Sequence, residues 1–322
     1  MAGVSIATAS RVVTGTVPVS PDRRARVERA IAELSYVPDE RARDLRRAAT
    51  RTVGIVVPTL EGPLYGEVFR IVHRALQRGG STVLVFESDD DRDAQRAAVD
   101  ALVRSHARAV VVATAVGLAP DALQQLRRRD IRVVFFGDRP ADPRQACVCV
   151  DDHGGSRLLT EHLIGLGHRR IALLCGALDG STGVDRRAGH LAALGDAGIE
   201  ADPDLIAAHD WLLPSGREAV ARLLDLEDPP TAILAADPML AAGALLALRE
   251  RGLRVPDDLS LASFFESDHI RYVTPAITCL MDVGEGMAGA IVDAVNHRGA
   301  GRIDVPLTPA LRPSTGPPRV SR

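Results

Sequence analysis

The sequence predicts an α/β fold built of two parallel-sheet units and preceded by a small all-helical segment. From residue 53 onward, short runs that are apolar on both faces alternate with amphipathic stretches, as in parallel sheets covered by helices. This alternation continues over about 250 residues, a length that favours two such units over one. Residues 1–52 contain helix-like patterns alone, so we expect them to form a separate segment.

Eight segments are predicted to be strands because they are short, apolar and bounded by turn residues. They are Val53–Val57, Thr82–Phe86, Ala109–Ala113, Val133–Phe136, Cys147–Val150, Ile171–Cys175, Ala232–Leu234 and Leu259–Phe264. Six amphipathic segments between them are predicted to be helices. They are Tyr65–Arg78, Asp91–Val103, Gly155–Leu166, Asp185–Ala197, Ser215–Leu224 and Met239–Arg251.

Three helix candidates precede the α/β body. The first is Ser5–Val13, with Ser5 as the residue that caps its N-terminus. The second, Ser20–Ser35, opens with a serine cap followed by a first-turn proline. The third, Pro38–Arg47, is polar and rich in arginine, so it should form only against a partner such as its dimer mate or DNA.

Charge is unevenly distributed along the chain. The first 52 residues hold ten arginines and six acidic residues, a net charge of +4, whereas the remainder carries −7. A basic end on an acidic body predicts one polyanion-binding segment. The apolar runs are too short to span a bilayer and no secretory pattern opens the chain, so we expect a cytoplasmic protein that does not enter membranes.

Cofactor and metal patterns are missing from the sequence. Cys147 and Cys149 match no zinc spacing, and we expect all four cysteines to be small buried hydrophobic residues. No GxGxxG, Walker or GxSxG pattern occurs, so neither a nucleotide cofactor nor α/β-hydrolase chemistry is supported. We therefore expect no cofactor and no metal.

The loops that follow the predicted strands are polar and rich in carboxylates. In open α/β sheets, ligands bind at the carboxyl ends of the strands, and two units together would form a cleft there. A binding site is therefore expected among these loops. They are Pro58–Pro63, Gly137–Arg139, Asp151–Gly155, Gly176–Gly183, Asp237–Pro238 and Phe265–Ser267.

Six stretches carry a resemblance that covers essentially the whole chain. They are AGVSIATASRVVTG (2–15), VSPDRRARVERAIAELSYVPDERARDLRR (19–47), TVGIVVP (52–58), HLIGLGHRRIALLCG (162–176), GLRVPDDLSLASF (252–264) and LRPST (311–315). In this order and at this spacing they resemble the lactose-repressor/galactose-repressor (LacI–GalR) family of bacterial regulators. The resemblance implies a repressor that binds a palindromic double-stranded DNA operator as a homodimer and senses a small sugar-like effector.

The resemblance also implies a domain organisation. Residues 1–37 would form a helix-turn-helix DNA-binding segment, and residues 38–51 a hinge helix and linker. Residues 52–150 with about 281–305 would form one subdomain of a periplasmic-binding-protein-like sensor. Residues 151–280 with about 306–322 would form the other.

The helix Ser5–Val13 matches the family's recognition helix, which enters the major groove. The positions that read bases in the family are here Ile6, Ala7 and Arg11. The positions that touch phosphates are Ser5, Thr8 and Ser10. Apolar side chains suit a thymine methyl group, whereas hydroxyls and arginine suit phosphate and guanine. A purely structural N-cap remains a compatible alternative for Ser5.

Pro38–Arg47 matches the family's hinge helix, which pairs in the dimer and enters the minor groove. Leu45 stands where the family wedges a leucine between base pairs, and Ala42 stands at its neighbour. The alternative for Leu45 is packing onto the sensor body.

The family's first helix precedes the AGVS turn, whereas this sequence begins inside that turn at Met1. Either the true start lies upstream or the product binds DNA poorly. We favour the first, because residues 4–47 otherwise keep the DNA-reading pattern. The alternative function is an effector-binding sensor with impaired DNA binding.

Nine positions match effector contacts of the family. They are Leu64, Tyr65, Asp138, Asp151, Thr182, Arg186, Trp211, Asp237 and Phe265. Carboxylates, an arginine and flat aromatic faces suit a sugar or related polar metabolite, because they bind hydroxyls and cover C–H surface. The alternatives are loop capping for Asp138 and Asp237, an ion pair with Asp185 or Asp179 for Arg186, and core packing for Trp211.

Phe265 departs from the family, which commonly has Gly-Phe-Asp-Asp where this chain has Ser263-Phe264-Phe265-Glu266. Either the effector is less hydroxylated at this point, or Glu266 takes the place of the missing aspartate.

Two other classes of protein are disfavoured. A periplasmic binding protein shares the expected fold but needs an export signal and no DNA-binding segment. An enzyme lacks support because the histidines are scattered and no Ser/His/Asp or metal constellation stands out. The sequence therefore favours a regulator that is not an enzyme.

Overall fold

The computed structural model describes residues 2–14, 18–34, 51–60, 62–113, 117–207, 210–281, 283–297, 299 and 301–319. The chain divides into two compact units, an N-terminal unit of residues 1–50 and a main unit of residues 51–322. The expected hinge helix Pro38–Arg47, with Ala42 and Leu45, lies outside the described residues.

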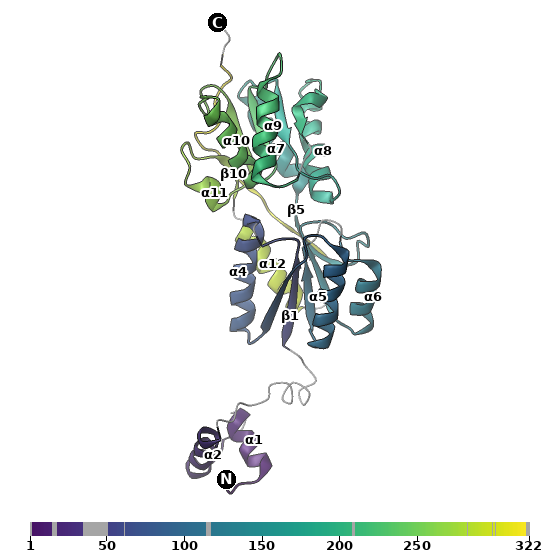
Figure 1. Cartoon of the computed structure of the whole chain (residues 1–322), viewed down its shortest axis with the longest axis vertical. Helices are drawn as coiled ribbons and strands as arrows, with labels where there is room; N and C mark the ends of the chain where they lie inside the picture. Colours follow the sequence, from purple (N-terminus) through teal and green to yellow (C-terminus); the bar gives the residue numbers. More distant parts are fainter. Residues whose placement is uncertain are drawn as a thin grey trace. The chain divides into compact units, whose positions relative to one another are not determined.

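The N-terminal unit contains α1 (Ile6–Thr14) and α2 (Pro21–Glu33) (Figure 1). Ser5 precedes α1 and its Oγ accepts a hydrogen bond from the backbone N–H of Thr8 at 3.2 Å, so the expected N-cap is confirmed. Val12 and Val27 are buried, one from each helix. Both expected helices are therefore confirmed.

The first sheet of the main unit has the strand order β11-β5-β4-β3-β1-β2, and its neighbouring strands are parallel. Its strands are β1 (Thr52–Val57), β2 (Thr82–Glu87), β3 (Ala109–Val112), β4 (Arg132–Phe136), β5 (Ala146–Val150) and β11 (Arg302–Val305). Two helix pairs cover its two faces, α4 with α12 and α5 with α6 (Figure 1). These helices are α4 (Pro63–Arg78), α5 (Arg92–Arg104), α6 (Pro120–Arg128) and α12 (Val283–Asn296).

The second sheet has the order β12-β10-β9-β8-β6-β7, parallel except for β12 against β10. Its strands are β6 (Ile171–Leu174), β7 (Ile206–Ala207), β8 (Ala232–Ala235), β9 (Ser260–Phe265), β10 (Thr278–Met281) and β12 (Thr308–Ala310). Helix α7 packs on α8, and α9 packs on α10. The bounds are α7 (Asp152–Gly165), α8 (Ser181–Asp196), α9 (Leu213–Leu224) and α10 (Pro238–Glu250), with two short helices, η1 (Pro203–Leu205) and α11 (Asp268–Arg271).

The chain passes between the two sheets three times. It crosses from β5 to α7, from β10 to α12, and from β11 to β12. These crossings are the basis on which we propose a first subdomain of residues 52–150 with about 281–305. The second proposed subdomain then comprises residues 151–280 with about 306–322.

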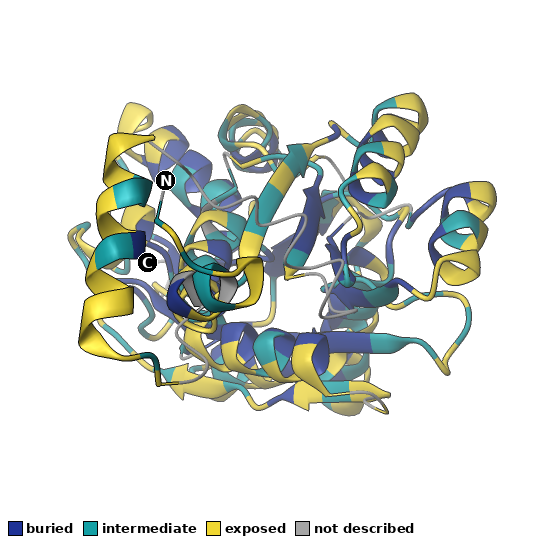
Figure 2. Cartoon of the chain, turned by 90° about the horizontal axis from the view of Figure 1, so that it is seen from below, coloured by how far each residue is buried: buried dark blue, intermediate teal, exposed yellow. Residues whose placement is uncertain are grey.

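Apolar strands form the core because both faces of each sheet are covered. Every residue of β3, β6, β8 and β9 is buried. The helices bury one face and expose the other (Figure 2). This burial explains the runs of apolar residues in the sequence, since a parallel sheet between two helix layers has no solvent-exposed face.

All eight expected strands and all six expected helices of the main unit are present. The sequence did not predict β7, β10, β11, β12, α6, α11, α12 and the short helix η1. Helix α8 begins at Ser181, four residues before the expected Asp185. The prediction of that start was wrong because the capping group comes from elsewhere in the chain.

Candidate effector cleft and DNA-binding helix

Arg186 on α8 is the centre of a buried polar cluster at the strand ends of the second sheet. The side chain is 4% exposed, and its Nε donates to Asp152 Oδ1 at 2.8 Å. Its Nη1 donates to the backbone carbonyl of Ala236, which follows β8. Asp152 is equally buried, so the two charges neutralise each other away from water.

Aromatic rings surround the same guanidinium. The Cζ atom of Arg186 lies 3.8 Å from the ring centroid of Phe264, 4.7 Å from Phe265 and 5.7 Å from Trp211. A cation over an aromatic face is stabilised by the ring quadrupole. Trp211 can approach because residue 176 is glycine, where a Cβ would lie 2.5 Å from the indole ring. Arg186 therefore ties α8 to the ends of β8 and β9.

Asp237 lies between β8 and α10 and caps that helix. Its Oδ1 accepts a hydrogen bond from Met239 N at 2.7 Å. Burial raises the pKa of the Asp237 carboxyl to about 6, against the opposing effect of the Met239 N–H and of Arg186. Burial also raises the pKa of Asp152, although Arg186 opposes the shift. Carboxylates held out of water in this way are typical of binding sites.

Tyr65 on α4 belongs to the part of the main unit that contains the first sheet. Its ring stacks on Phe69 at 6.3 Å and packs edge-on against Phe136 at 6.0 Å. Burial raises the pKa of its hydroxyl above the ordinary value, and the negative charges of Asp138, Asp90 and Asp237 raise it further, while Arg186 lowers it. The phenol therefore lies within electrostatic reach of groups from both sheets.

Asp138, after β4, contacts the start of α8. Its Oδ1 accepts from Thr182 N at 2.8 Å and from Ser181 Oγ at 3.1 Å. Asp138 and Thr182 are thus brought together as a helix cap, although one follows a strand of the first sheet and the other a strand of the second. The alternative of a capping role is therefore borne out by contacts for both Asp138 and Asp237.

Two further expected effector residues lie at a helix cap and at the edge of the core. Asp151 is exposed and caps α7, accepting from Gly154 N at 2.8 Å. Leu64 is partly buried at the edge of the main hydrophobic cluster.

Two of the alternatives are corrected by the contacts. The ion-pair partner of Arg186 is Asp152, not Asp185 or Asp179. Glu266 does not stand free for an effector, because it pairs with Arg271 at 2.8 Å and with Arg312. Asp152, Asp90 and Ser181 were missed, although Asp152 sits next to the expected Asp151 in a post-strand loop.

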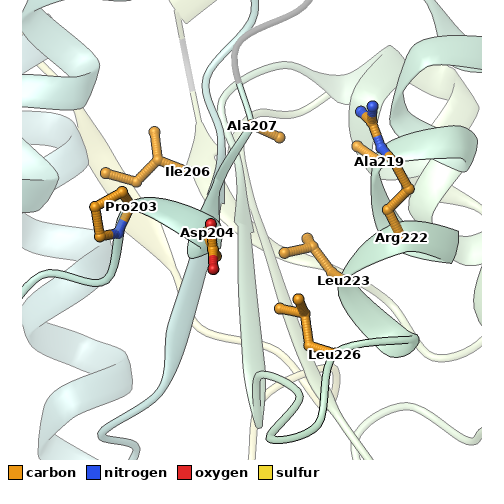
Figure 3. Close-up of a pocket in the computed structure, with 8 residues that line it drawn as sticks. All are labelled: Pro203, Asp204, Ile206, Ala207, Ala219, Arg222, Leu223 and Leu226. Atoms are coloured by element: carbon orange, nitrogen blue, oxygen red, sulfur yellow. The ribbon is translucent and has the colours of Figure 1, made fainter.

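A separate pocket of about 470 Å³ lies at the edge of the second sheet (Figure 3). Figure 3 shows η1 and β7 on one side of it and α9 on the other. Its lining residues are Pro203, Asp204, Ile206, Ala207, Ala219, Arg222, Leu223 and Leu226. None of the nine expected effector residues lines this pocket, so it is distinct from the Arg186 cluster.

In the N-terminal unit, α1 presents its expected base-reading residues to the surface. Ile6 is 88% exposed, and Ala7 and Arg11 are exposed as well. The hydroxyls of Ser5 and Thr8 hydrogen-bond each other at 2.9 Å. The side chain of Ser10 lies outside the described residues. An isoleucine so exposed on a short helix has no packing role of its own.

The histidines of the HLIGLGH segment are structural. His168 is buried, and its ring nitrogens contact Thr231 at 2.9 Å and Gly316 O at 2.8 Å. His162 contacts Thr315 at 3.0 Å. They anchor the C-terminal segment to the second sheet.

Within the part of the chain that the structure describes, no three His, Cys, Asp or Glu side chains are grouped to hold a metal ion. Among the same residues, no helix is both long and apolar enough to cross a membrane.

Comparisons with known proteins agree with this architecture. The family model described as periplasmic binding proteins and sugar-binding domain of the LacI family matches residues 50–272. The model described as bacterial regulatory proteins, lacI family, matches residues 1–39. The chain is 33% identical to the transcriptional regulator GalR of Escherichia coli K12 over 86% of this chain and 81% of that protein. It is 29% identical to the repressor PurR of Haemophilus influenzae PittEE over 97% and 94%.

Two solved structures show the same fold. One is the lac repressor dimer bound to operator and the anti-inducer ONPF, with a TM-score of 0.86 and 26% identity over 98% of this chain and 96% of that one. The other is a complex of the transcriptional regulator CelR with cellobiose, with a TM-score of 0.74 and 30% identity over 98% and 97%. With both family models matched in order and the relatives covered almost end to end, this chain belongs to the LacI family of ligand-responsive, DNA-binding transcriptional regulators.

Proposed function

We propose that this protein is a cytoplasmic, non-enzymatic repressor that binds operator DNA as a homodimer and responds to a small polyhydroxylated effector. The observation that carries the effector site is the buried guanidinium of Arg186 at the strand ends of the second sheet, with the rings of Trp211 and Phe265 beside it. An arginine, carboxylates and aromatic rings offer donors and acceptors for hydroxyl groups and flat faces for C–H surface.

The effector residues proposed from the sequence fall into two groups. We assign direct contacts with the effector to Arg186, at the centre of the buried cluster, and to Tyr65, Trp211, Asp237 and Phe265. Asp138 and Thr182 bound the same region. Leu64 and Asp151 are proposed at its margin. One relative supports the ligand class, since the CelR structure, 30% identical to this chain, is a complex with cellobiose.

The effector site is tested with Tyr65→Phe, which removes one hydroxyl and keeps the ring packing. A thermal-shift screen of sugars, polyols and purines identifies a ligand for the wild type, since a ligand at a hundredfold over its Kd adds about 2.7 kcal/mol of stability. Calorimetry with that ligand should then show an affinity about three- to tenfold lower for Tyr65→Phe, the effect of one lost hydrogen bond.

Tyr272→Phe is the matched control, because this tyrosine is 78% exposed and lies after α11. Its affinity for the ligand should equal that of the wild type. Equal affinities for all three proteins would remove Tyr65 from the effector site.

DNA binding is tested with Ile6→Ala. The side chain is 88% exposed, so its removal should change the free energy of unfolding by less than about 0.5 kcal/mol. We expect affinity for an operator, selected from a random DNA library with the wild type, to fall about fivefold or more, because an apolar contact to a base is lost. Fluorescence anisotropy at fixed salt measures the change.

Val85→Ala serves as the control, an equally apolar truncation at a 42% exposed position of β2. Unchanged operator affinity in Ile6→Ala would argue that α1 does not read bases through this residue.

A further inference from the structure

We infer that Asp138 and Arg139, after β4, form a latch with the first turn of α8 that holds the two proposed subdomains together beside the Arg186 cluster. The latch is a means of regulating the proposed effector cleft and in that respect rests on the proposed function. Its contacts, however, join two segments of the main unit and can be tested with neither effector nor DNA.

The first part of the latch is a helix cap supplied across the two sheets. The first N–H groups of any helix lack partners within it and need an acceptor. Helix α8 begins after Gly180, which has no side chain to provide one. The Asp138 carboxylate provides it instead, accepting from Thr182 N at 2.8 Å and Ser181 Oγ at 3.1 Å. A negative charge at this end of a helix is also favoured by the helix dipole.

Gly180 makes room for this carboxylate. A Cβ at residue 180 would lie 2.5 Å from Asp138 Oδ1 and 2.9 Å from its Cγ. Any side chain there would therefore displace the capping carboxylate.

The second part of the latch is an ion pair. The Arg139 backbone N–H donates to Ser181 Oγ at 2.9 Å. Its guanidinium binds both oxygens of Asp185, with Nη2 and Oδ1 3.0 Å apart. Such a two-point pair fixes orientation as well as distance. Asp185 is 19% exposed and Arg139 37%, so the pair is partly shielded from water.

The latch is connected to the effector cluster through α8 itself. Asp185 directly precedes Arg186, which is bound to Asp152 and to the carbonyl of Ala236. The start of α8 is therefore held by the first sheet, and the next residue is held by the second. These contacts stabilise one arrangement of the two proposed subdomains. An effector that binds the same arrangement more tightly adds to that stabilisation, and an effector that binds another arrangement more tightly must overcome it.

The experiment measures the distance between the subdomains in the full chain. Nitroxide labels are placed on Gln124→Cys in α6 and Glu200→Cys after α8, both exposed positions. The native cysteines are buried and should not be labelled. Labelled protein is mixed with a large excess of unlabelled protein, so that only distances within one chain are measured by pulsed electron resonance.

Wild type should give a single narrow distance distribution. Arg139→Asp, Asp185→Arg and Gly180→Ala should each give a broader or displaced distribution. The ratio of molecules at the wild-type distance to molecules at other distances should fall about tenfold, which corresponds to about 1.4 kcal/mol. The charge swap that combines Arg139→Asp with Asp185→Arg should restore the wild-type distribution, because it rebuilds the ion pair in reverse. If either substitution acted only by damaging the local fold, the second substitution would not restore the distribution.

The matched control is the exposed pair Arg217–Glu250, which joins α9 to α10 within the second sheet's helices at 2.9 Å. Arg217→Asp should leave the distribution unchanged. Identical distributions for wild type and all three latch variants would overturn the inference, as would a charge swap that fails to restore. If the protein proved to bind no sugar and no operator, the proposed function would fail while these distances would still show the latch.

Discussion

Replacing Arg186 with methionine is expected to lower the free energy of unfolding by about 3–5 kcal/mol, because it leaves Asp152 buried without its partner. Both side chains are only 4% exposed, so water cannot replace the lost contact. Methionine keeps much of the volume of the arginine stem against Phe264 and Phe265, which limits the cavity contribution. Urea denaturation at neutral pH measures the change.

A second variant separates charge from packing. Arg186→Met combined with Asp152→Leu removes both charges, and it should recover most of the lost stability, since apolar replacements of buried ion pairs are often neutral. The matched control is Arg217→Met, which breaks an ion pair with both side chains about half exposed and should cost no more than about 1 kcal/mol. A loss as small as the control's in Arg186→Met would mean that Asp152 reaches water or another partner.

The strands could be predicted because their burial leaves a direct mark on the sequence. A parallel strand covered on both faces, such as β6 or β8, consists wholly of buried apolar residues. Strand β11 could not be found in this way, since Arg302 and Asp304 are exposed and alternate with less exposed residues at the sheet edge. Strand β7 has two residues, too few for any periodicity.

The start of α8 was missed for a different reason. A helix start is recognisable in a sequence when a capping side chain stands just before it, and Gly180 has no side chain. The cap comes from Asp138, 44 residues before Thr182. Contacts over such separations leave no local pattern, so only the folded chain reveals them.

The site was predictable by residue type more than by partner. Asp237 lies in one of the predicted post-strand loops, whereas Tyr65 and Arg186 were expected from the family resemblance. The sequence could not show that Asp152, and not Asp151, is the partner of Arg186. The two aspartates are adjacent, and only the folded helix α7 determines which one is buried. One is 4% exposed and pairs with the arginine, whereas the other caps the helix at the surface.

Asp237→Asn is expected to stabilise the protein above about pH 6 by up to about 3 kcal/mol and to leave its stability near pH 4 almost unchanged. Burial raises the folded-state pKa of this carboxyl from 3.8 to about 6. A raised pKa in an acid means that the folded state binds the proton more tightly than the unfolded state. The contribution of Asp237 to stability is therefore greatest below about pH 4, falls as the pH rises to about 6, and stays lost above it.

Asparagine is neutral at every pH, and its Oδ1 can still accept the hydrogen bond that Asp237 takes from Met239 N. The stability of the variant should therefore not fall between about pH 4 and pH 6 as that of the wild type does. Thermal melts of wild type and variant at about pH 4 and pH 7.5 measure the difference, and Asp91→Asn, an exposed cap of α5, is the control that should show no comparable gain at the higher pH. If Asp237 contacts the effector as proposed, the stabilised variant should also bind the effector more weakly, because a binding site often holds a polar group at some cost to stability. An Asp237→Asn protein that is less stable than wild type at pH 7.5 would show that the ionised carboxylate is favoured in the fold, contrary to its burial.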